Sequence, residues 1–249
     1  MNKYAIVTGV SSGIGECIAN RFIEEGIHVF GMDVNVPNNK KIEYFKCDIR
    51  DENEIINIIK RIQNKTDHID FLINVAGIFC YSERALIENL STEEWNNVIN
   101  INLTGTFLIT KHTIPLLKKS YNGNIINFSS EQVIMPQIKS APYAISKAGI
   151  EMFSKILALE LIEDKIRVNT IALASVKTNF LKKYKKDETI FNQMMEETNK
   201  KMPYGIITPN DVYKFVKYLI EDDNKITGQT IVIDSGIILD SLKKKKENK

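Results

Sequence analysis

The sequence predicts an α/β fold in one domain, built on a doubly wound parallel β-sheet with helices on both faces. Short apolar runs recur along the chain, amphipathic helical patterns separate them, and no Pro/Gly-rich linker divides the 249 residues. The apolar runs are continuous rather than alternating, which is typical of strands covered on both faces. Strands that alternate in this way with helices indicate a doubly wound sheet.

The expected elements follow one another along the whole chain. Strands are predicted at residues 5–7, 29–32, 71–75, 125–128, 168–174 and 230–233. Helices are predicted at residues 14–25, 52–65, 92–119, 143–163 and 210–221. Each helical pattern places its apolar residues on one face, as the 3.6-residue period of a helix requires.

Two segments depart from this rhythm. Residues 177–208 are too long for a plain connection and are expected to form a substrate-loop lid. The stretch 177–201 carries seven lysines against four acids, which would suit an acidic substrate, although a solvated face is the simpler explanation. The predicted domain is therefore 1–240, followed by a basic tail at 241–249 that is expected to be disordered.

Composition excludes several classes of protein. A net charge of +2 gives no reason to expect nucleic acid as a partner. Cys17, Cys47 and Cys80 lie far apart and fit reduced, buried thiols, and the three histidines lack metal-ligand spacing, so no metal is expected. No apolar run approaches the roughly 18 residues of a membrane span, and no signal peptide precedes the first strand. These features predict a cytoplasmic protein without a membrane partner.

A glycine-rich loop follows the first strand. The segment "TGVSSGIG" places Gly9, Gly13 and Gly15 directly before a helix. Glycine allows positive φ and a close approach of backbone to ligand, and the N-terminus of the helix directs N–H groups at an anion. The loop predicts a pyrophosphate site, and a plain glycine-rich turn is the alternative.

An acidic residue ends the second strand. Asp33 lies 18 residues after Gly15, close to the separation of about 20 at which an acid accepts hydrogen bonds from the adenosine ribose. Its charge would repel the 2′-phosphate of NADP. Asp33 therefore favours NAD(H) as the cofactor, and a polar strand-end residue is the alternative.

A tyrosine and a lysine share one helix face in "YAISK", because Tyr143 and Lys147 are four residues apart. Free tyrosine has a pKa of about 10, too high for a base at neutral pH. A cation about 4 Å away, at an effective dielectric of about 20, would favour the phenolate by about 4 kcal/mol. Tyr143 is then a candidate general base for an alcohol proton.

Together with "CDIRD", "NVAG", "INLTG" and "NFSS", these motifs resemble the classical short-chain dehydrogenase/reductase family over essentially the whole chain. The resemblance implies a Rossmann-type fold and an NAD(P)-dependent oxidoreductase that prefers NAD(H). It assigns a catalytic tetrad to Asn102, Ser130, Tyr143 and Lys147. In it Ser130 holds the substrate oxygen, Lys147 also binds the nicotinamide ribose, and Asn102 anchors a water that passes protons onward.

The resemblance also assigns the cofactor site. The residues expected to bind NAD are Gly9, Ser11, Ser12, Gly13, Ile14, Gly15, Asp33, Asp48, Ile49, Asn74, Ala76, Gly77, Tyr143, Lys147, Val176 and Thr178. The expected substrate is a small secondary alcohol or ketone. Candidate walls of its pocket are Phe79, Cys80, Tyr81, Glu131, Gln132 and the lid with Tyr184.

Two other functions remain open. One is a 3-oxoacyl-thioester reductase, against which Asp33 argues because most such enzymes use NADPH. The other is a non-catalytic NAD-binding sensor or scaffold.

A homotetramer is expected, with a homodimer as the alternative, because helices starting near Thr92 and Tyr143 carry second apolar faces. These faces include Phe107, Phe153 and Leu157.

One stretch departs from the family pattern. In "NTIALASVKT", residues 169–178, Leu173 and Ala174 stand where the family usually has proline and glycine. The change removes a fixed φ of about −65° and adds a methyl group where the backbone nears the cofactor. The sequence therefore predicts a looser or shifted turn, and this expectation motivates the sensor alternative.

Overall fold

The computed structural model of the chain describes residues 2–180 and 187–241. Tyr184 and the tail from residue 242 onward lie outside the described residues, and so do the expectations attached to them. In the described part of the chain, no helix combines the length and apolar character needed to cross a membrane.

Within the described residues, seven parallel strands form one sheet in the order β3-β2-β1-β4-β5-β6-β7. They are β1 (Tyr4–Thr8), β2 (His28–Asp33), β3 (Glu43–Lys46), β4 (Phe71–Asn74), β5 (Asn124–Ser130), β6 (Arg167–Leu173) and β7 (Thr230–Ile233). Six match predicted apolar runs. Strand β3 lacked that signal because charged residues, Glu43 and Lys46, stand at its two ends and only Phe45 is buried. The strand order turns back between β1 and β4, and a doubly wound sheet binds its ligand at such a point.

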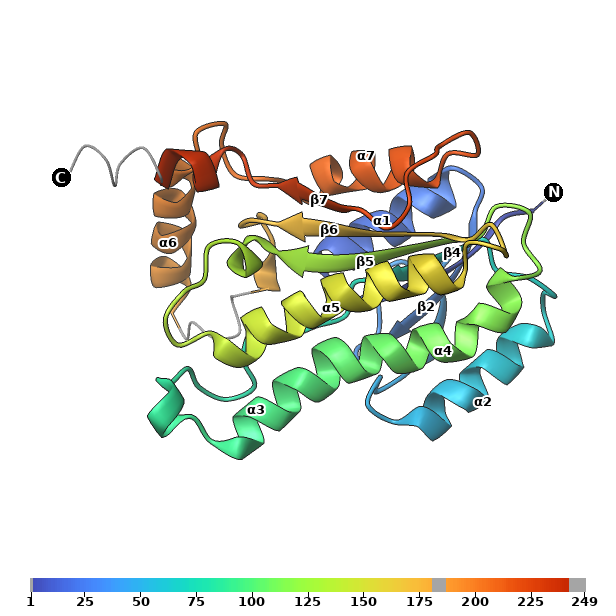
Figure 1. Ribbon diagram of the computed structural model, residues 1–249, viewed down its shortest axis with the longest axis horizontal. Helices are drawn as coiled ribbons and strands as arrows, with labels where there is room; N and C mark the ends of the chain where they lie inside the picture. The colour runs from blue at the N-terminus through green and yellow to red at the C-terminus, as the bar shows by residue number, and fades with distance from the viewer. Residues whose placement is uncertain (1, 181–186, 242–249) are drawn as a thin grey trace.

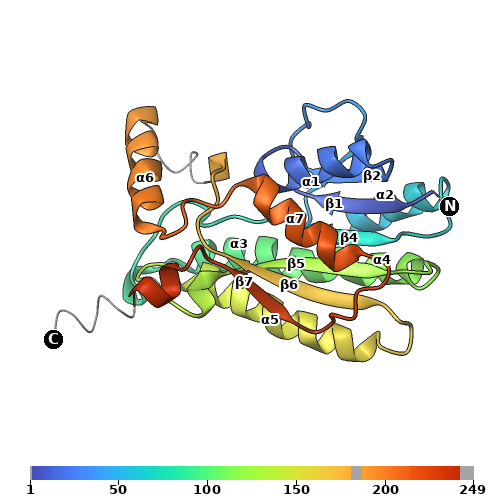
Figure 2. The ribbon, with the colours of Figure 1, turned by 90° about the horizontal axis from the view of Figure 1, so that it is seen from above.

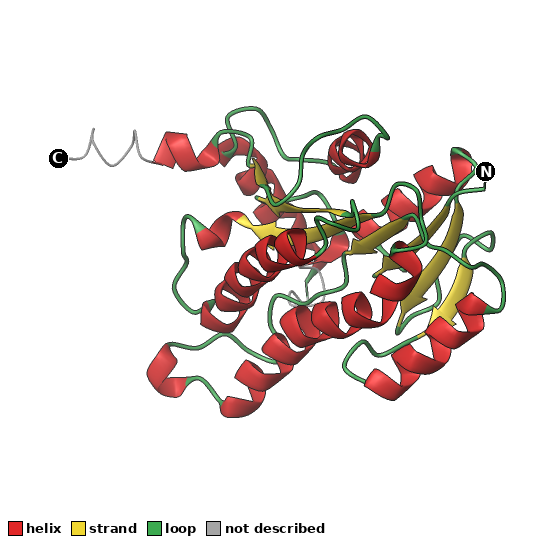
Figure 3. Cartoon of the chain, turned by 45° about the vertical axis from the view of Figure 1, so that its right-hand side comes forward, coloured by secondary structure: helices red, strands yellow, loops and turns green. Residues whose placement is uncertain are grey.

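Helices cover both faces of the sheet (Figures 1 and 3). They are α1 (Gly13–Glu24), α2 (Glu52–Gln63), α3 (Thr92–Ile99), α4 (Gly105–Leu117), α5 (Ala141–Glu160), α6 (Glu188–Lys201) and α7 (Pro209–Ile220). Helices α1 and α7 pack on one face, and α2, α4 and α5 pack on the other. The fold class predicted from the sequence is confirmed.

Each face of the sheet has its own apolar core. Phe22 of α1 and Val216 of α7 belong to one core, and Ile55 of α2 and Ile109 of α4 belong to the other. Burial of each such side chain contributes about 1.5–3 kcal/mol. Leu157 also lies in the second core and is 4% exposed, so the expectation that it forms an outward face was wrong. Its position on α5 turns it toward the sheet.

The carboxyl ends of the strands and α6 lie at one end of the molecule, and the N-terminus lies at the other (Figure 2). Helix α6 occupies part of the segment predicted as a lid. Asp187 caps it by accepting hydrogen bonds from the backbone N–H groups of Thr189 and Ile190. Helix α6 therefore stands near the carboxyl ends of the strands, where the ligand site was predicted.

Candidate active site

The loop between β1 and α1 has the shape of a phosphate cradle. Gly9 and Gly13 have φ of +74° and +62°, which L-residues with side chains rarely adopt. A Cβ atom on Gly15 would lie 2.1 Å from the carbonyl oxygen of Gly9, so a side chain cannot fit there. A Cβ on Gly9 would lie 3.1 Å from the nitrogen of Ala76, and one on Gly13 would lie 3.3 Å from Cγ2 of Thr178. The loop thus brings together residues that the sequence assigned to one cofactor.

Local sequence explains why this loop is exposed at the start of α1. Ser12 is the N-cap residue, and its side chain makes no capping hydrogen bond. The first backbone N–H groups of the helix are therefore not satisfied by a cap, and such groups bind anions. Ile14 packs on the core beneath the loop and anchors it. The residues present fit a pyrophosphate.

Asp33 lies beside this loop at the end of β2. Its Oδ2 atom accepts a hydrogen bond of 2.9 Å from the backbone N–H of Ser11, and its Oδ1 atom accepts one of 2.9 Å from the N–H of Asn35. These two bonds fix the carboxylate against the cradle.

Three of the predicted cofactor-binding residues also make contacts within the protein. Asp48 makes a two-pronged ion pair with Arg50, at 2.6 Å between Oδ2 and Nη2, and this guanidinium lowers the pKa of the Asp48 carboxyl. Ile49 is buried against Gly105 at the start of α4. Asn74 donates through Nδ2 to Oδ1 of Asn127 at 2.8 Å. That bond ties β4 to β5, and the Oδ1 atom of Asn74 is buried without a partner among the described residues.

Lys147 is the buried cation of the site. Its side chain projects from α5, and Nζ donates to the carbonyl oxygen of Phe128 at 2.9 Å. Nζ lies 5.7 Å from the centre of the Tyr143 ring. Burial lowers the pKa of Lys147 to about 8, because its charged form loses solvation. A Cβ on Gly77 would lie 3.7 Å from Nζ, so this glycine leaves room above the lysine.

Asn102 is presented by a π-helical segment, Asn100–Thr104, between α3 and α4. Such single-turn widenings often occur at functional sites. The Asn102 side chain is fully buried; Oδ1 accepts from the N–H of Ile78 at 2.8 Å, and Nδ2 donates to the Ile78 carbonyl at 2.9 Å and to Oγ of Ser146 at 3.0 Å. Asn102 thus joins the segment after β4 to α5. The contact with Ser146 was not predicted, because its two residues are 44 apart along the chain.

Ser130 ends β5, and its hydroxyl faces polar neighbours. Oγ donates to Oε2 of Glu131 at 2.9 Å and accepts from the backbone N–H of Gln132 at 3.2 Å. Both neighbours, predicted as substrate residues, are buried. The Oε1 atom of Gln132 has no hydrogen-bond partner in the described part of the chain.

An aromatic wall stands next to Tyr143. The ring of Phe79 meets that of Tyr143 edge to face, with centroids 5.0 Å apart. The Arg84 guanidinium lies over the Phe79 ring, 4.8 Å from its centroid. Arg84 also donates to the carbonyls of Ile138 and Lys139, at 2.8 and 3.0 Å. This arginine therefore connects two loops at the candidate substrate site, and the sequence analysis missed it.

A buried glutamate holds the loop that carries this wall. Glu94 of α3 is 1% exposed, and its carboxylate accepts from the backbone N–H groups of Tyr81 and Ser82 at 2.6 and 2.7 Å. It also accepts from the Ser82 hydroxyl at 3.0 Å. Charge-assisted hydrogen bonds of this kind are strong and directional. This role of Glu94 was not predicted from the sequence. Its partners Tyr81 and Ser82 lie in the loop after β4, and no local sequence pattern indicates that α3 packs against this loop.

The turn after β6 differs from the expectation. The N–H of Ala174 donates to the Ile233 carbonyl at 3.0 Å, and the N–H of Lys177 donates to the Ile207 carbonyl at 2.8 Å. Val176 forms a parallel bridge with Ile207, and Ala174 has no positive φ. The prediction of a looser turn was therefore wrong, because backbone pairing fixes this segment where the family uses proline and glycine, whereas the alternative of a shifted turn stays a prediction.

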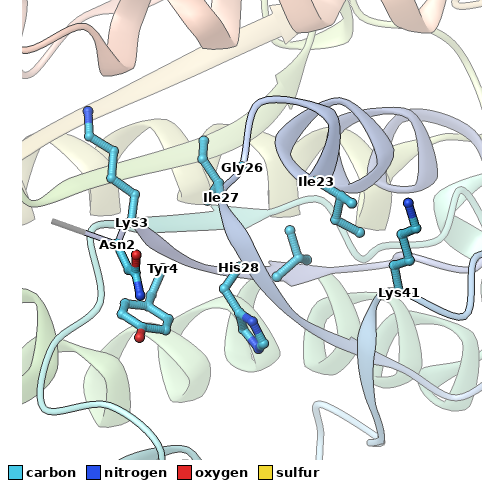
Figure 4. Close-up of a pocket in the computed structure, with 9 residues that line it drawn as sticks. Asn2, Lys3, Tyr4, Ile23, Gly26, Ile27, His28 and Lys41 are labelled. Atoms are coloured by element: carbon cyan, nitrogen blue, oxygen red, sulfur yellow. The ribbon is translucent and has the colours of Figure 1, made fainter.

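Two hollows in the surface differ in their relation to this site. A groove of about 840 Å³ is bordered by α1, α6 and the start of α7 and shares Gly13 and Thr178 with the cofactor cradle. The other, of about 330 Å³, lies at the amino ends of β1 and β2, with Lys3 and Lys41 at opposite sides (Figure 4). The catalytic candidates are at the carboxyl ends, so only the groove borders the site.

The chain belongs to the short-chain dehydrogenase family, because the family model described as "short chain dehydrogenase" matches residues 3–189. It is 30% identical over 250 residues to a 3-oxoacyl-(acyl-carrier-protein) reductase of Thermotoga maritima, covering 95% of this chain and 98% of that protein. It is 31% identical over 254 residues to a 2,3-dihydro-2,3-dihydroxybenzoate dehydrogenase of Bacillus subtilis, covering 95% and 96%.

The solved structure of Thermoplasma acidophilum aldohexose dehydrogenase is similar in fold, with a TM-score of 0.89 and 28% identity over 96% of this chain and 94% of that one. Other similar structures contain NADH or NADPH. These findings confirm the predicted family and the predicted class, an oxidoreductase that uses a nicotinamide cofactor.

Proposed function

We propose that this oxidoreductase uses NAD(H) to interconvert a small secondary alcohol and its ketone. The preference for NAD(H) over NADP(H) is inferred from the Asp33 carboxylate, which two backbone N–H groups fix beside the cradle. NADP would place a second negative charge near it. The same observation weighs against a 3-oxoacyl-thioester reductase that depends on NADPH.

The bound nicotinamide would supply or accept the hydride. In the oxidation, Tyr143 takes the hydroxyl proton, and the Lys147 ammonium favours its phenolate form. Ser130 holds the substrate oxygen, and Asn102 anchors the water that carries the proton onward. In the cradle, Ser11, Ser12, Gly13 and Ile14 hold the pyrophosphate. Around it, the proposed cofactor contacts are Asp48 and Ile49 for the adenine, and Asn74, Ala76, Gly77, Val176 and Thr178 for the ribose and nicotinamide.

The site carries a positive charge that favours an anionic substrate. Arg84 is exposed, and both hydrogen bonds that fix its guanidinium go to neutral backbone carbonyls, so these partners do not cancel its charge. It is separated from Tyr143 by the single ring of Phe79. We therefore propose a cyclic hydroxy acid, or its keto form, as the preferred substrate. The lysines of the lid are not needed for this proposal.

The test is a matched substrate panel followed by NADH absorbance. The panel pairs trans-1,2-cyclohexanediol with trans-2-hydroxycyclohexanecarboxylate, and adds D-glucose and S-acetoacetyl-N-acetylcysteamine. We expect turnover with NAD(H), a lower KM for the carboxylate, and loss of that advantage in Arg84→Gln. Turnover of the thioester alone, with NADPH, would instead establish the reductase alternative. Tight NADH binding without turnover of any member would favour the sensor.

The assembly we propose is a homotetramer, with a homodimer as the alternative. Helix α5 exposes the apolar side chains Ile145, Met152, Ile156 and Leu159. A second apolar surface, formed by α7 and β7, exposes Phe215, Tyr218 and Val232. Two separate self-complementary surfaces are what a tetramer with two kinds of two-fold interface requires.

The proposed location is the cytoplasm, since the three cysteines form no disulfide and lie within the described residues.

A further inference from the structure

Glu131 shares the proton of the candidate catalytic serine. It directly follows β5, and its Oε2 atom accepts a hydrogen bond of 2.9 Å from Ser130 Oγ. Ser130 is 3% exposed and Glu131 is 8% exposed, so water does not compete strongly for this contact. The N–H of Gln132 donates to the same Oγ atom at 3.2 Å. Two hydrogen-bonding groups thus contact one hydroxyl, and their balance decides what remains for a substrate.

An ionised Glu131 would make Ser130 a poor partner for a ketone. A hydroxyl has one hydrogen to donate and two lone pairs that accept, and a carboxylate only accepts. The single hydrogen of Ser130 is then directed at Oε2 of Glu131, which lies 2.9 Å from Oγ. One lone pair accepts from Gln132, and the other faces the substrate. A carbonyl oxygen beside it would gain no hydrogen bond and would be repelled.

A protonated Glu131 reverses the arrangement. Its O–H can donate to Ser130 Oγ, while the Gln132 N–H fills the second lone pair. The hydrogen of Ser130 is then the group left for the substrate oxygen, where negative charge develops. We propose, on the basis of the role assigned to Ser130 above, that Glu131 is a positioning residue whose gain or loss of one proton switches the catalytic serine on or off.

The surroundings of Glu131 make its protonated form accessible. Burial raises the pKa of its carboxyl above the ordinary range, hydrogen bonds from Ser130 and from its own backbone N–H oppose the rise, and the charge of Asp234 at the end of β7 adds to it. The helix packed on this segment is α5. Its titratable groups here are Tyr143, Lys147 and Glu151, the last of which accepts from Ser129.

The sign of the pH effect follows from these groups. Glu131 is neutral below its raised pKa and becomes ionised as the pH rises through it. The active state of Ser130 therefore belongs to the low-pH side. Loss of one donor to a developing oxyanion costs about 10²–10³-fold in rate. Reduction should fall by that order over this step, which is separate from any step due to Tyr143.

The first test compares pH profiles for single-turnover reduction of cyclohexane-1,2-dione by NADH. Glu131→Gln keeps the size of the side chain and a hydrogen-bond donor but cannot ionise. We therefore expect the fall in rate assigned to Glu131 to vanish in this variant, while any step due to Tyr143 remains. Ser130→Ala should show a low rate without the fall assigned to Glu131. If that fall in rate persists in Glu131→Gln, the proposal is overturned, whatever the absolute rate of that variant.

The second test does not need turnover. Infrared difference spectra of the NADH complex should show a protonated-carboxyl band that disappears with rising pH. The band should be absent in Glu131→Gln and should shift in Ser130→Ala, because its hydrogen-bond partner is lost. A missing band at every pH at which the protein stays folded would refute the switch. If no ketone is reduced but the band titrates and responds to Ser130→Ala, the proposed reaction fails and the shared proton stands.

Discussion

Replacing Leu173 by proline and Ala174 by glycine is expected to harm this protein, although the family usually has those residues at these positions. Leu173 is the last residue of β6, paired with Ser130 on one side and Ile233 on the other. Proline has no N–H, and in an interior strand it leaves a ladder position unpaired. Ala174 needs no glycine, because its φ is not positive and its N–H already bonds to Ile233.

The size of the effect can be worked out from burial. Leu173 is 7% exposed and lies in the core shared with α1 and α7. Truncating a buried leucine to alanine costs about 2–5 kcal/mol, and a proline ring recovers about half of that. An unpaired buried acceptor adds about 1–3 kcal/mol, and glycine in place of alanine adds about 0.5–1 kcal/mol. The double variant should lose about 3–6 kcal/mol of unfolding free energy, which corresponds to a Tm lower by roughly 6–24 °C.

Urea unfolding followed by circular dichroism, at fixed protein concentration, measures this loss. Leu173→Ala serves as the control that removes the side chain and keeps the backbone N–H of residue 173. Ala174→Gly serves as the control that keeps both the Leu173 side chain and this N–H. Single-turnover hydride transfer should slow because the segment before Thr178 is no longer held in place. A double variant as stable as the parent, with faster hydride transfer, would show that the backbone pairing does not position this turn.

Four further results are expected. Tyr143→Phe should lower turnover about 10²–10⁴-fold and leave NADH binding, measured by fluorescence, nearly unchanged, since the phenol acts on the substrate proton; a variant with most of its activity would place the base elsewhere. The unmodified protein should bind NADH far better than NADPH, and Asp33→Ala should narrow the gap; equal affinities in the parent would reject the role of Asp33. Glu94→Gln should raise KM more than it lowers kcat, because weaker bonds to Tyr81 and Ser82 loosen the substrate wall, and an unchanged KM would refute this. Light scattering should show a tetramer that Leu159→Glu converts to smaller species, and a monomeric parent at micromolar concentration would contradict the two interfaces.

The sequence by itself determined the features that depend on neighbours along the chain. Continuous apolar runs separated by amphipathic patterns identified six of the seven strands, because burial on both faces leaves a local signature. The glycine loop and the Tyr143–Lys147 pair were also visible, since their chemistry requires fixed residue types at fixed spacing. Strand β3 gave no apolar run because its sequence, Glu43–Lys46, has a charged residue at each end and only Phe45 is buried.

Only the tertiary structure decided how distant segments meet. Glu94 holds a loop 11 to 13 residues before it, Asn102 bonds to Ser146 across 44 residues, and Ala174 bonds to Ile233 across the sheet. Glu131 was recognised as a pocket residue, but its hold on the Ser130 proton depends on a buried side-chain geometry that spacing does not encode. Such contacts are decided by packing, because the energy of a polar pair depends on which groups burial brings within hydrogen-bond distance and removes from water.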